Sequence, residues 1–237
     1  MKVLVIPDVH LKPWIFDRAM SIMSDGKCDM AVFMGDLVDD WGCEGDVDLY
    51  EETLGKAVEF VKKYPSTLWC HGNHDLAYLW EDTDHPGYSE DAADTVIEYL
   101  SILEDAFDSP ENMAVIHRID NVLFSHAGLT AKFVASFVED AGDDIDDVIA
   151  AVNSFGEDEL SAYFSPVWAR PQDDHGYEKL YAPGYLQVVG HTPVKGITQQ
   201  DELLSTDTFS TWSTGAKYGD EQFCIVDTVT KEWDYAE

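Results

Sequence analysis

Five short motifs, spread over almost the whole chain, place polar residues at the ends of apolar segments that are typical of β-strands. Carboxylate oxygens and imidazole nitrogens on loops at strand ends are the ligands from which hydrolytic sites with two metal ions are built. Four of the eight histidines lie in these motifs, which indicates a fold that gathers several strand ends into one site. The motifs are Asp8-Val9-His10, Gly35-Asp36-Leu37-Val38-Asp39, Gly72-Asn73-His74-Asp75, Ser125-His126-Ala127-Gly128 and Gly190-His191-Thr192-Pro193.

The first 75 residues alternate between predicted strands and predicted helices. Short apolar runs predict strands over Lys2–Pro7, Met30–Met34 and Thr67–Cys70. Helices are expected over Trp14–Ser24 and about Leu49–Lys63, where the apolar residues keep to one helical face. Strands separated by helices of this length favour parallel βαβ units.

The rest of the chain follows a different pattern. Helices are expected near Asp91–Asp105, Thr130–Glu139 and Ile145–Asn153, and a strand pair near Ala114–Ser125. A parallel first half followed by a mostly antiparallel end predicts two packed sheets with helices outside, in a single domain over residues 1–237. The short strands expected at the end are Gln187–Val189, Val194–Thr198, Leu203–Asp207, Phe223–Asp227 and Glu232–Tyr235.

The charge of the chain limits its partners. It carries 47 acidic residues against 14 lysines and arginines, a formal net charge of −33. Such a surface repels the nucleic-acid backbone, so no nucleic-acid partner is expected. It also repels a phosphorylated substrate at long range. Any phosphate that binds must therefore be held locally, by metal ions or by a few placed cations.

The sequence shows no targeting or membrane-spanning signal. Nothing near Met1 resembles a signal peptide, and no apolar stretch approaches the roughly 20 residues that span a bilayer. We therefore expect a cytoplasmic protein with no membrane partner. The four cysteines lack the spacing of a zinc clamp or a redox motif and are expected to be free thiols. The oligomeric state is left open.

The motif residues have the chemistry of metal ligands. Asp8 and His10 flank a single residue, so in an extended or tightly turning segment both side chains reach the same ion. The carboxylate of Asp36 has two oxygens and can bridge two cations. The remaining candidate ligands are the carbonyl oxygen of Asn73 and the imidazoles of His126 and His191.

This series of motifs resembles that of the calcineurin-like metallophosphoesterases, and most closely their phosphoprotein phosphatase branch. That family reads Asp-x-His, Gly-Asp-x-x-Asp, Gly-Asn-His-Glu/Asp, a later His, and Gly-His, and the match extends here from Asp8 to Pro193. The resemblance implies an α/β fold, a four-layer α/β/β/α sandwich of two mixed sheets with flanking helices. Helical segments at about 81–110 and 130–165 would partly cover the site.

The resemblance also implies a ligand set for two metal ions. Metal 1 would be held by Asp8, His10 and Asp36. Metal 2 would be held by Asp36, which bridges the two ions, together with Asn73, His126 and His191. Manganese is the expected metal, although mixed nitrogen and oxygen ligation also suits iron and zinc. The ions would activate a water for in-line attack on phosphorus.

His74 would not be a ligand but the general acid that protonates the leaving group. Asp75 would fix the tautomer of His74 and raise its pKa, as carboxylates commonly do for histidines. Asp39 would orient a ligand by hydrogen bonding.

One position departs from the protein phosphatases of this family, and another departs from the broader family, many of whose members have a second metal-binding histidine where this chain has Pro193. The protein phosphatases have an arginine after the second motif that grips the substrate phosphate, whereas this chain has Asp40, which would add repulsion. Pro193 follows the Gly-His motif, as in the phosphoprotein phosphatase and dinucleoside tetraphosphatase branches. Of the three arginines, Arg170 is the candidate for the missing clamp, because guanidinium binds phosphate in a bidentate way. A structural ion pair is the alternative for Arg170.

Four histidines match no motif position, and each is expected to be structural or exposed. Of these, only His175 is expected near enough to Arg170 to touch a substrate. The four are His71, His85, His117 and His175.

Three functions compete. The first is a two-metal phosphoesterase, similar to serine/threonine phosphatases, that hydrolyses phosphate monoesters of a phosphorylated protein or small molecule. The second is a pyrophosphohydrolase of dinucleoside polyphosphates, which the shared Gly-His-Thr-Pro motif allows. The third is a non-catalytic binding module, which would be expected to have lost ligands or the acid. Since every ligand position and His74 are intact, the sequence favours an enzyme.

Overall fold

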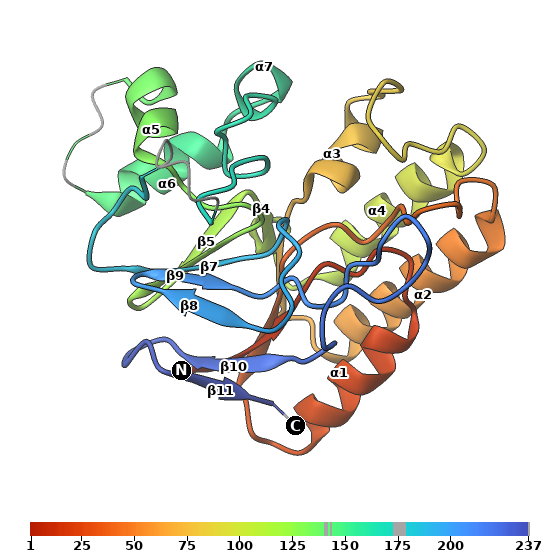
Figure 1. Cartoon of the computed structure of the whole chain (residues 1–237), viewed down its shortest axis with the longest axis horizontal. Helices are drawn as coiled ribbons and strands as arrows, with labels where there is room; N and C mark the ends of the chain where they lie inside the picture. Colours follow the sequence, from red (N-terminus) through yellow and green to blue (C-terminus); the bar gives the residue numbers. More distant parts are fainter. Residues whose placement is uncertain (140–141, 143, 173–178, 237) are drawn as a thin grey trace.

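The computed structural model describes residues 1–139, 142, 144–172 and 179–236, and its first strand shows how the layers arise. In β1 (Lys2–Ile6), Val3 and Val5 pack into one apolar cluster, while Leu4 and Ile6 pack into another. Successive side chains of a strand point to opposite faces, so β1 is buried on both sides. One face meets a second sheet and the other meets helices, which gives four layers (Figure 1).

The first sheet carries the parallel strands of the N-terminal half. Its six strands lie in the order β11-β10-β1-β2-β3-β4. Pairings among β1 to β4 are parallel, and β10 and β11 add antiparallel strands at one side. The further strands of this sheet are β2 (Met30–Phe33), β3 (Leu68–Cys70), β4 (Met113–Ala114), β10 (Cys224–Asp227) and β11 (Trp233–Tyr235).

The second sheet has five strands in the order β5-β6-β7-β9-β8. The β6–β7 and β7–β9 pairings are parallel, whereas the two outer pairings are antiparallel. The carboxyl ends of β6, β7 and β9 therefore share one edge, as those of β1, β2 and β3 do in the first sheet. The strands are β5 (Ile116–Ile119), β6 (Val122–Ser125), β7 (Leu186–Val189), β8 (Thr198–Gln200) and β9 (Leu203–Ser205).

Helices cover the outer face of each sheet (Figure 1). Helices α1 (Trp14–Ser24), α2 (Val47–Lys63) and α4 (Ala93–Ala106) pack on the first sheet, around the rings of Phe16, Phe33 and Phe60. The helices over the second sheet are α5 (Ala131–Phe137), α6 (Ile145–Asn153) and α7 (Glu157–Leu160). Helix α3 (Asn73–Leu79) follows β3, and a short 3-10 helix, η1 (Pro110–Asn112), precedes β4.

The predicted layered α/β fold is confirmed. The C-terminal part is mostly antiparallel, as expected, since β8, β10 and β11 form antiparallel pairings, whereas β7 and β9 pair with each other in parallel. Of the strand expected over Val194–Thr198, only Thr198 is in a strand, β8. Within the described part of the chain, no helix is long and apolar enough to cross a membrane.

Candidate metal centre

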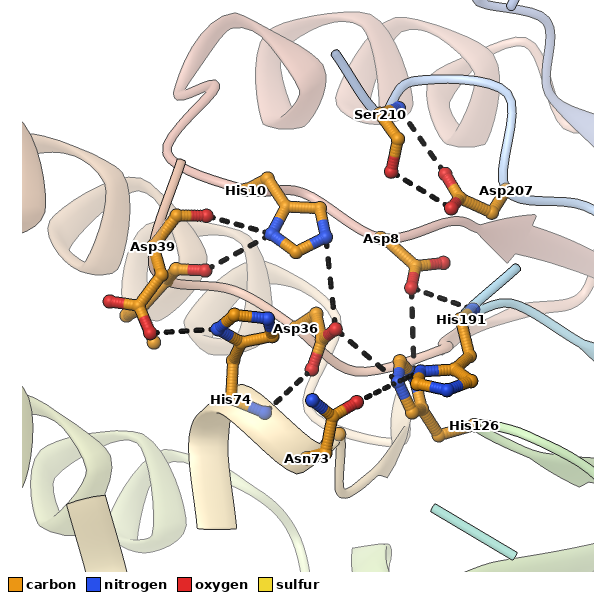
Figure 2. A network of polar contacts seen from close by, with 12 residues as sticks. Asp8, His10, Asp36, Asp39, Asn73, His74, His126, His191, Asp207 and Ser210 are labelled. Atoms are coloured by element: carbon orange, nitrogen blue, oxygen red, sulfur yellow. Dashed lines mark hydrogen bonds and ion pairs between the residues drawn. The ribbon is translucent and has the colours of Figure 1, made fainter. Parts of the chain in front are cut away.

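The predicted ligands meet where the parallel strands of both sheets end (Figure 2). Asp8 and His10 follow β1, Asp36 follows β2, and Asn73 follows β3. His126 and His191 follow β6 and β7 of the other sheet. Ligands in open α/β sheets characteristically bind beyond the carboxyl ends of the strands.

Asp36 is the centre of this arrangement. Its Oδ2 lies 3.3 Å from His126 Nε2 and 3.7 Å from His10 Nε2, while its Oδ1 accepts a hydrogen bond from the His74 backbone N–H at 3.0 Å. One carboxylate therefore faces histidines from both sheets, which is the position a bridging ligand requires.

His126, Asn73 and His191 converge on one point. The Nδ1 of His126 is 2.7 Å from the Met34 carbonyl oxygen, to which it donates, so its Nε2 is left to face the site. That Nε2 lies 2.9 Å from Asn73 Oδ1 and 3.1 Å from His191 Nδ1. His10 is oriented in the same way, with its Nδ1 donating to the Asp39 carbonyl at 2.7 Å.

Asp8 differs from Asp36, the other predicted carboxylate ligand, in that one of its oxygens has no partner among the described residues. This oxygen is the buried Oδ2, whereas Oδ1 accepts the His191 backbone N–H at 2.8 Å. Burial, and then the neighbouring Asp207, raise the pKa of Asp8 well above its usual range. A buried carboxylate in this situation is stabilised by a cation.

The residues present fit two metal ions. One ligand atom from each of His10, Asp36 and His74 lies within 4.8 Å of the other two, and the same holds for Asp36, His126 and His191. Asp39, His74 and His85 form a third such group, and Asp8 belongs to none of the three. The site offers imidazole, carboxylate and amide donors, together with the unpartnered Oδ2 of Asp8. Manganese, iron and zinc all bind such a mixed set of ligands.

His74 pairs with Asp39, not with Asp75. The Nδ1 of His74 donates to Asp39 Oδ2 at 2.8 Å, which leaves Nε2 as the second proton-carrying atom of the ring. Burial opposes the charged form of His74, but Asp36 and the hydrogen bond to Asp39 outweigh it and raise the pKa of His74.

The prediction that Asp75 fixes the tautomer of His74 is therefore wrong, although Asp75 is among the charges that raise the pKa of His74, after Asp36 and Asp39. Asp75 is fully buried and accepts backbone N–H bonds from Asp36 at 2.8 Å, Leu37 at 2.9 Å and Gly72 at 3.1 Å. Neighbouring residues at the start of a helix point in different directions, and Asp75 points back to the helix N-terminus. It holds together the loops that carry Asp36 and Asn73.

Asp39 is in turn fixed by two tyrosines that the sequence analysis did not single out. Its Oδ1 accepts hydrogen bonds from Tyr50 at 2.8 Å and from Tyr78 at 2.6 Å. Both tyrosines are fully buried, on α2 and α3. Their helical spacing indicates only buried positions, so no sequence signal distinguishes them from core residues.

The acidic Asp40 does not stand unpaired in the site. Lys12 Nζ lies 2.9 Å from Asp40 Oδ2 and also donates to the His10 carbonyl at 3.0 Å. Burial alone would raise the pKa of Asp40, but Lys12 and a hydrogen bond from Thr211 lower it. The expected repulsion of phosphate by Asp40 is therefore offset by Lys12.

Asp207 is a buried carboxylate that the sequence analysis missed. It follows β9 and accepts two hydrogen bonds from Ser210, from its backbone N–H at 3.2 Å and its hydroxyl at 2.8 Å (Figure 2). The strand-end position that identified the other site residues also applies to Asp207, and that signal would have found it.

A cavity of about 330 Å³ opens beside these residues. His10, Asp36, Asn73, His74 and His191 line it, with residues 85–87 and Trp168. Arg170 also lines it, and its Nη1 donates to Thr192 Oγ1 at 3.1 Å. His175 lies outside the described residues. His85, expected to be structural or exposed, is buried in the cavity wall.

A sequence model of the calcineurin-like phosphoesterases matches residues 1–209. The chain belongs to the calcineurin-like phosphoesterase family. It is therefore a metal-dependent phosphoric ester hydrolase, and the binding module is not favoured. A search of curated proteins returned no match.

A solved structure supports the fold of this calcineurin-like phosphoesterase, and two others align with lower TM-scores. A protein serine/threonine phosphatase from Saccharomyces cerevisiae aligns with a TM-score of 0.50 and 18% identity, covering 95% of this chain and 72% of that one. A metallophosphoesterase from Sphaerobacter thermophilus aligns with a TM-score of 0.48 and 16% identity, covering 99% of this chain and 86% of that one. An archaeal phosphodiesterase aligns with a TM-score of 0.42 and 14% identity, covering 99% of this chain and 98% of that one. At these identities, the yeast structure supports the fold alone.

We expect Gly190→Ala to disrupt the metal centre. A Cβ at Gly190 would lie 2.1 Å from Asp8 Oδ2, so the carboxylate must move. Disturbing a buried group that contacts the ligands lowers metal affinity by about 10–100-fold, which titration with Mn²⁺ measures. Gly45→Ala is the matched control, because its Cβ meets no atom within 4 Å. Unchanged metal affinity in Gly190→Ala would contradict the assigned role of Asp8.

Proposed function

We propose that this phosphoesterase hydrolyses phosphate monoesters and uses His74 as the general acid. The observation that carries the proposal is the His74–Asp39 pair, 2.8 Å apart, beside the Asp36 carboxylate and in the wall of the cavity. An acid held at that place serves a reaction whose leaving group is a poor one, such as an alkoxide.

The cationic groups around the cavity support a monoester. The terminal phosphate of a monoester has three non-bridging oxygens, whereas a diester has two. Two metal ions and the guanidinium of Arg170 would match three oxygens. The net charge of −33 further disfavours a nucleic-acid diester.

Each residue then has a defined task. His10, Asp36, Asn73, His126 and His191 would hold the two ions, with Asp8 joining them through its unpaired oxygen. When bound, the ions supply an activated water and neutralise charge on the phosphate oxygens. His74 would give its Nε2 proton to the leaving oxygen, and Asp39 would stabilise the charged ring beforehand. Arg170 would orient the phosphate from the rim.

The first test is activity with added Mn²⁺ on a panel of phosphoesters. The protein should hydrolyse an aryl phosphate and lose this activity on chelation, and Asp36→Asn should lower the rate by several orders of magnitude. Asp46→Asn is the matched control, because Asp46 only caps α2 and asparagine caps equally well. Activity that survives chelation, or an active Asp36→Asn protein, would contradict the metal mechanism. Faster hydrolysis of diesters or dinucleoside polyphosphates would contradict the monoester assignment.

Asp39→Asn should shift the pH dependence of the reaction. The Asp39 carboxylate helps raise the pKa of His74, so the protonated acid persists to higher pH in the wild type. Its loss lowers that pKa, and the alkaline fall in rate should move to lower pH. The rate on an alkyl phosphate should drop by about 10²–10⁴-fold, and much less on a nitrophenyl phosphate, whose leaving group needs no proton. Asp46→Asn, which makes the same change at the carboxylate that caps α2, is the control for pH–rate profiles. An unmoved alkaline limb would contradict the role of Asp39.

Arg170→Ala should weaken substrate binding. A charge-assisted hydrogen bond contributes about 1.5–3 kcal/mol, so the KM should rise by about 10–100-fold. Arg118→Ala is the control, since Arg118 pairs with Asp146 at 2.7 Å on the exposed side of β5. A KM unchanged by Arg170→Ala would contradict a role of Arg170 in binding the phosphate.

A further inference from the structure

The side-chain amide of Asn73 has two orientations of nearly equal shape, but only one of them offers an oxygen to a metal ion. Its Oδ1 lies 2.9 Å from His126 Nε2, among the other ligand atoms. Rotating the amide by half a turn would place its NH₂ group there, and an amide nitrogen is a donor with no lone pair to give. Something other than shape must therefore select the orientation.

His85 is placed to make this selection. Its Nε2 lies 3.0 Å from Asn73 Nδ2, on the side of the amide away from His126. Because an amide nitrogen can only donate, Nε2 must accept, and a neutral ring that accepts at Nε2 carries its proton on Nδ1. In the flipped orientation, two acceptors, Asn73 Oδ1 and His85 Nε2, would face each other.

The ring of His85 is held rigidly enough to act in this way. It is 6% exposed and packs between His74, at a centroid distance of 4.5 Å, and Trp168, at 5.4 Å. Its backbone N–H donates to Asp82 at 3.1 Å, and its carbonyl accepts from Tyr88 at 3.1 Å. The loop of residues 85–87 also passes close to His74, the proposed general acid, since a Cβ on Gly87 would lie 3.3 Å from His74 Cε1.

Packing alone does not explain a histidine at this position. Its Nδ1 is buried and has no hydrogen-bond partner within the described ranges. A buried donor without a partner is unfavourable, and phenylalanine would fill the space without one. The acceptor that histidine offers to Asn73 is the compensating gain.

We propose that His85 is a positioning residue for the second metal ion. His85 accepts the Nδ2–H of Asn73 and so holds the Oδ1 of Asn73 towards the ion. The proposal rests on the metal-binding part of the proposed function. It does not depend on the substrate, because its readout is metal affinity.

Two substitutions at His85 separate this role from packing. His85→Phe keeps a ring but removes the acceptor, and it should weaken the binding of one of two Mn²⁺ ions by about 10–100-fold in calorimetric titration. His85→Gln restores an acceptor oxygen and should recover most of that affinity. His117→Phe is the control, a buried histidine whose Nε2 lies 3.0 Å from the Trp69 carbonyl oxygen and which contacts no ligand. It should leave both affinities unchanged.

Full affinity in His85→Phe, or equal losses in the Phe and Gln variants, would overturn the proposal. If the Phe variant does not fold, NMR spectroscopy of the wild-type protein loaded with Zn²⁺ tests the proposal instead. In its ¹H–¹⁵N correlation spectrum, the Nε2 of His85 should be the unprotonated nitrogen, and a proton on Nε2 would overturn the proposal. A protein with His85-dependent metal affinity that hydrolyses no phosphoester would refute the proposed function and leave this inference standing.

Discussion

The carboxylate of Asp75 joins the loops on which the metal centre depends. It accepts the backbone N–H groups of Asp36, Leu37 and Gly72, so the loops after β2 and β3 are held at fixed distance. Asp36 in turn accepts the N–H of His74, which ties the acid to the bridging carboxylate. Because Asp75 is fully buried, these bonds are made away from water, where each backbone donor needs a partner. The positions of Asp36, Asn73 and His74 relative to one another therefore depend on this connection.

Positive charge around the site is supplied locally in an otherwise acidic molecule. Lys12 is buried against Asp40 and the His10 carbonyl, so it neutralises the residue that replaces the arginine of related phosphatases. Arg170 stands at the rim of the cavity. With a net charge of −33, the molecule repels phosphate at long range, so attraction must come from cations placed close to the site, as these two are. This arrangement explains how such a protein accommodates an anionic substrate.

The sequence predicted the framework better than the contacts within it. Alternation of strand and helix placed α1 and α6 with their observed bounds, and strand-end position brought Asp36, His126 and His191 to one centre. It failed where the direction of a side chain matters. Asp75 lies next to His74 in the chain, yet helix α3 begins at Asn73 and turns the two side chains apart. His85 has no motif, since its role comes from a loop that folds back over the acid.

Four residues of the site have a strained backbone conformation. His10, Asp36, Asp39 and His191 all adopt left-handed φ angles of 44°, 50°, 62° and 61°, which non-glycine residues seldom do. Each such residue costs on the order of 1–3 kcal/mol, which the surrounding fold must offset. The strands that these turns follow, β1, β2 and β7, contribute Val5, Val32 and Val188 to the buried cluster between the two sheets. Burial of these strands therefore helps to offset the strain of the turns that carry the ligands.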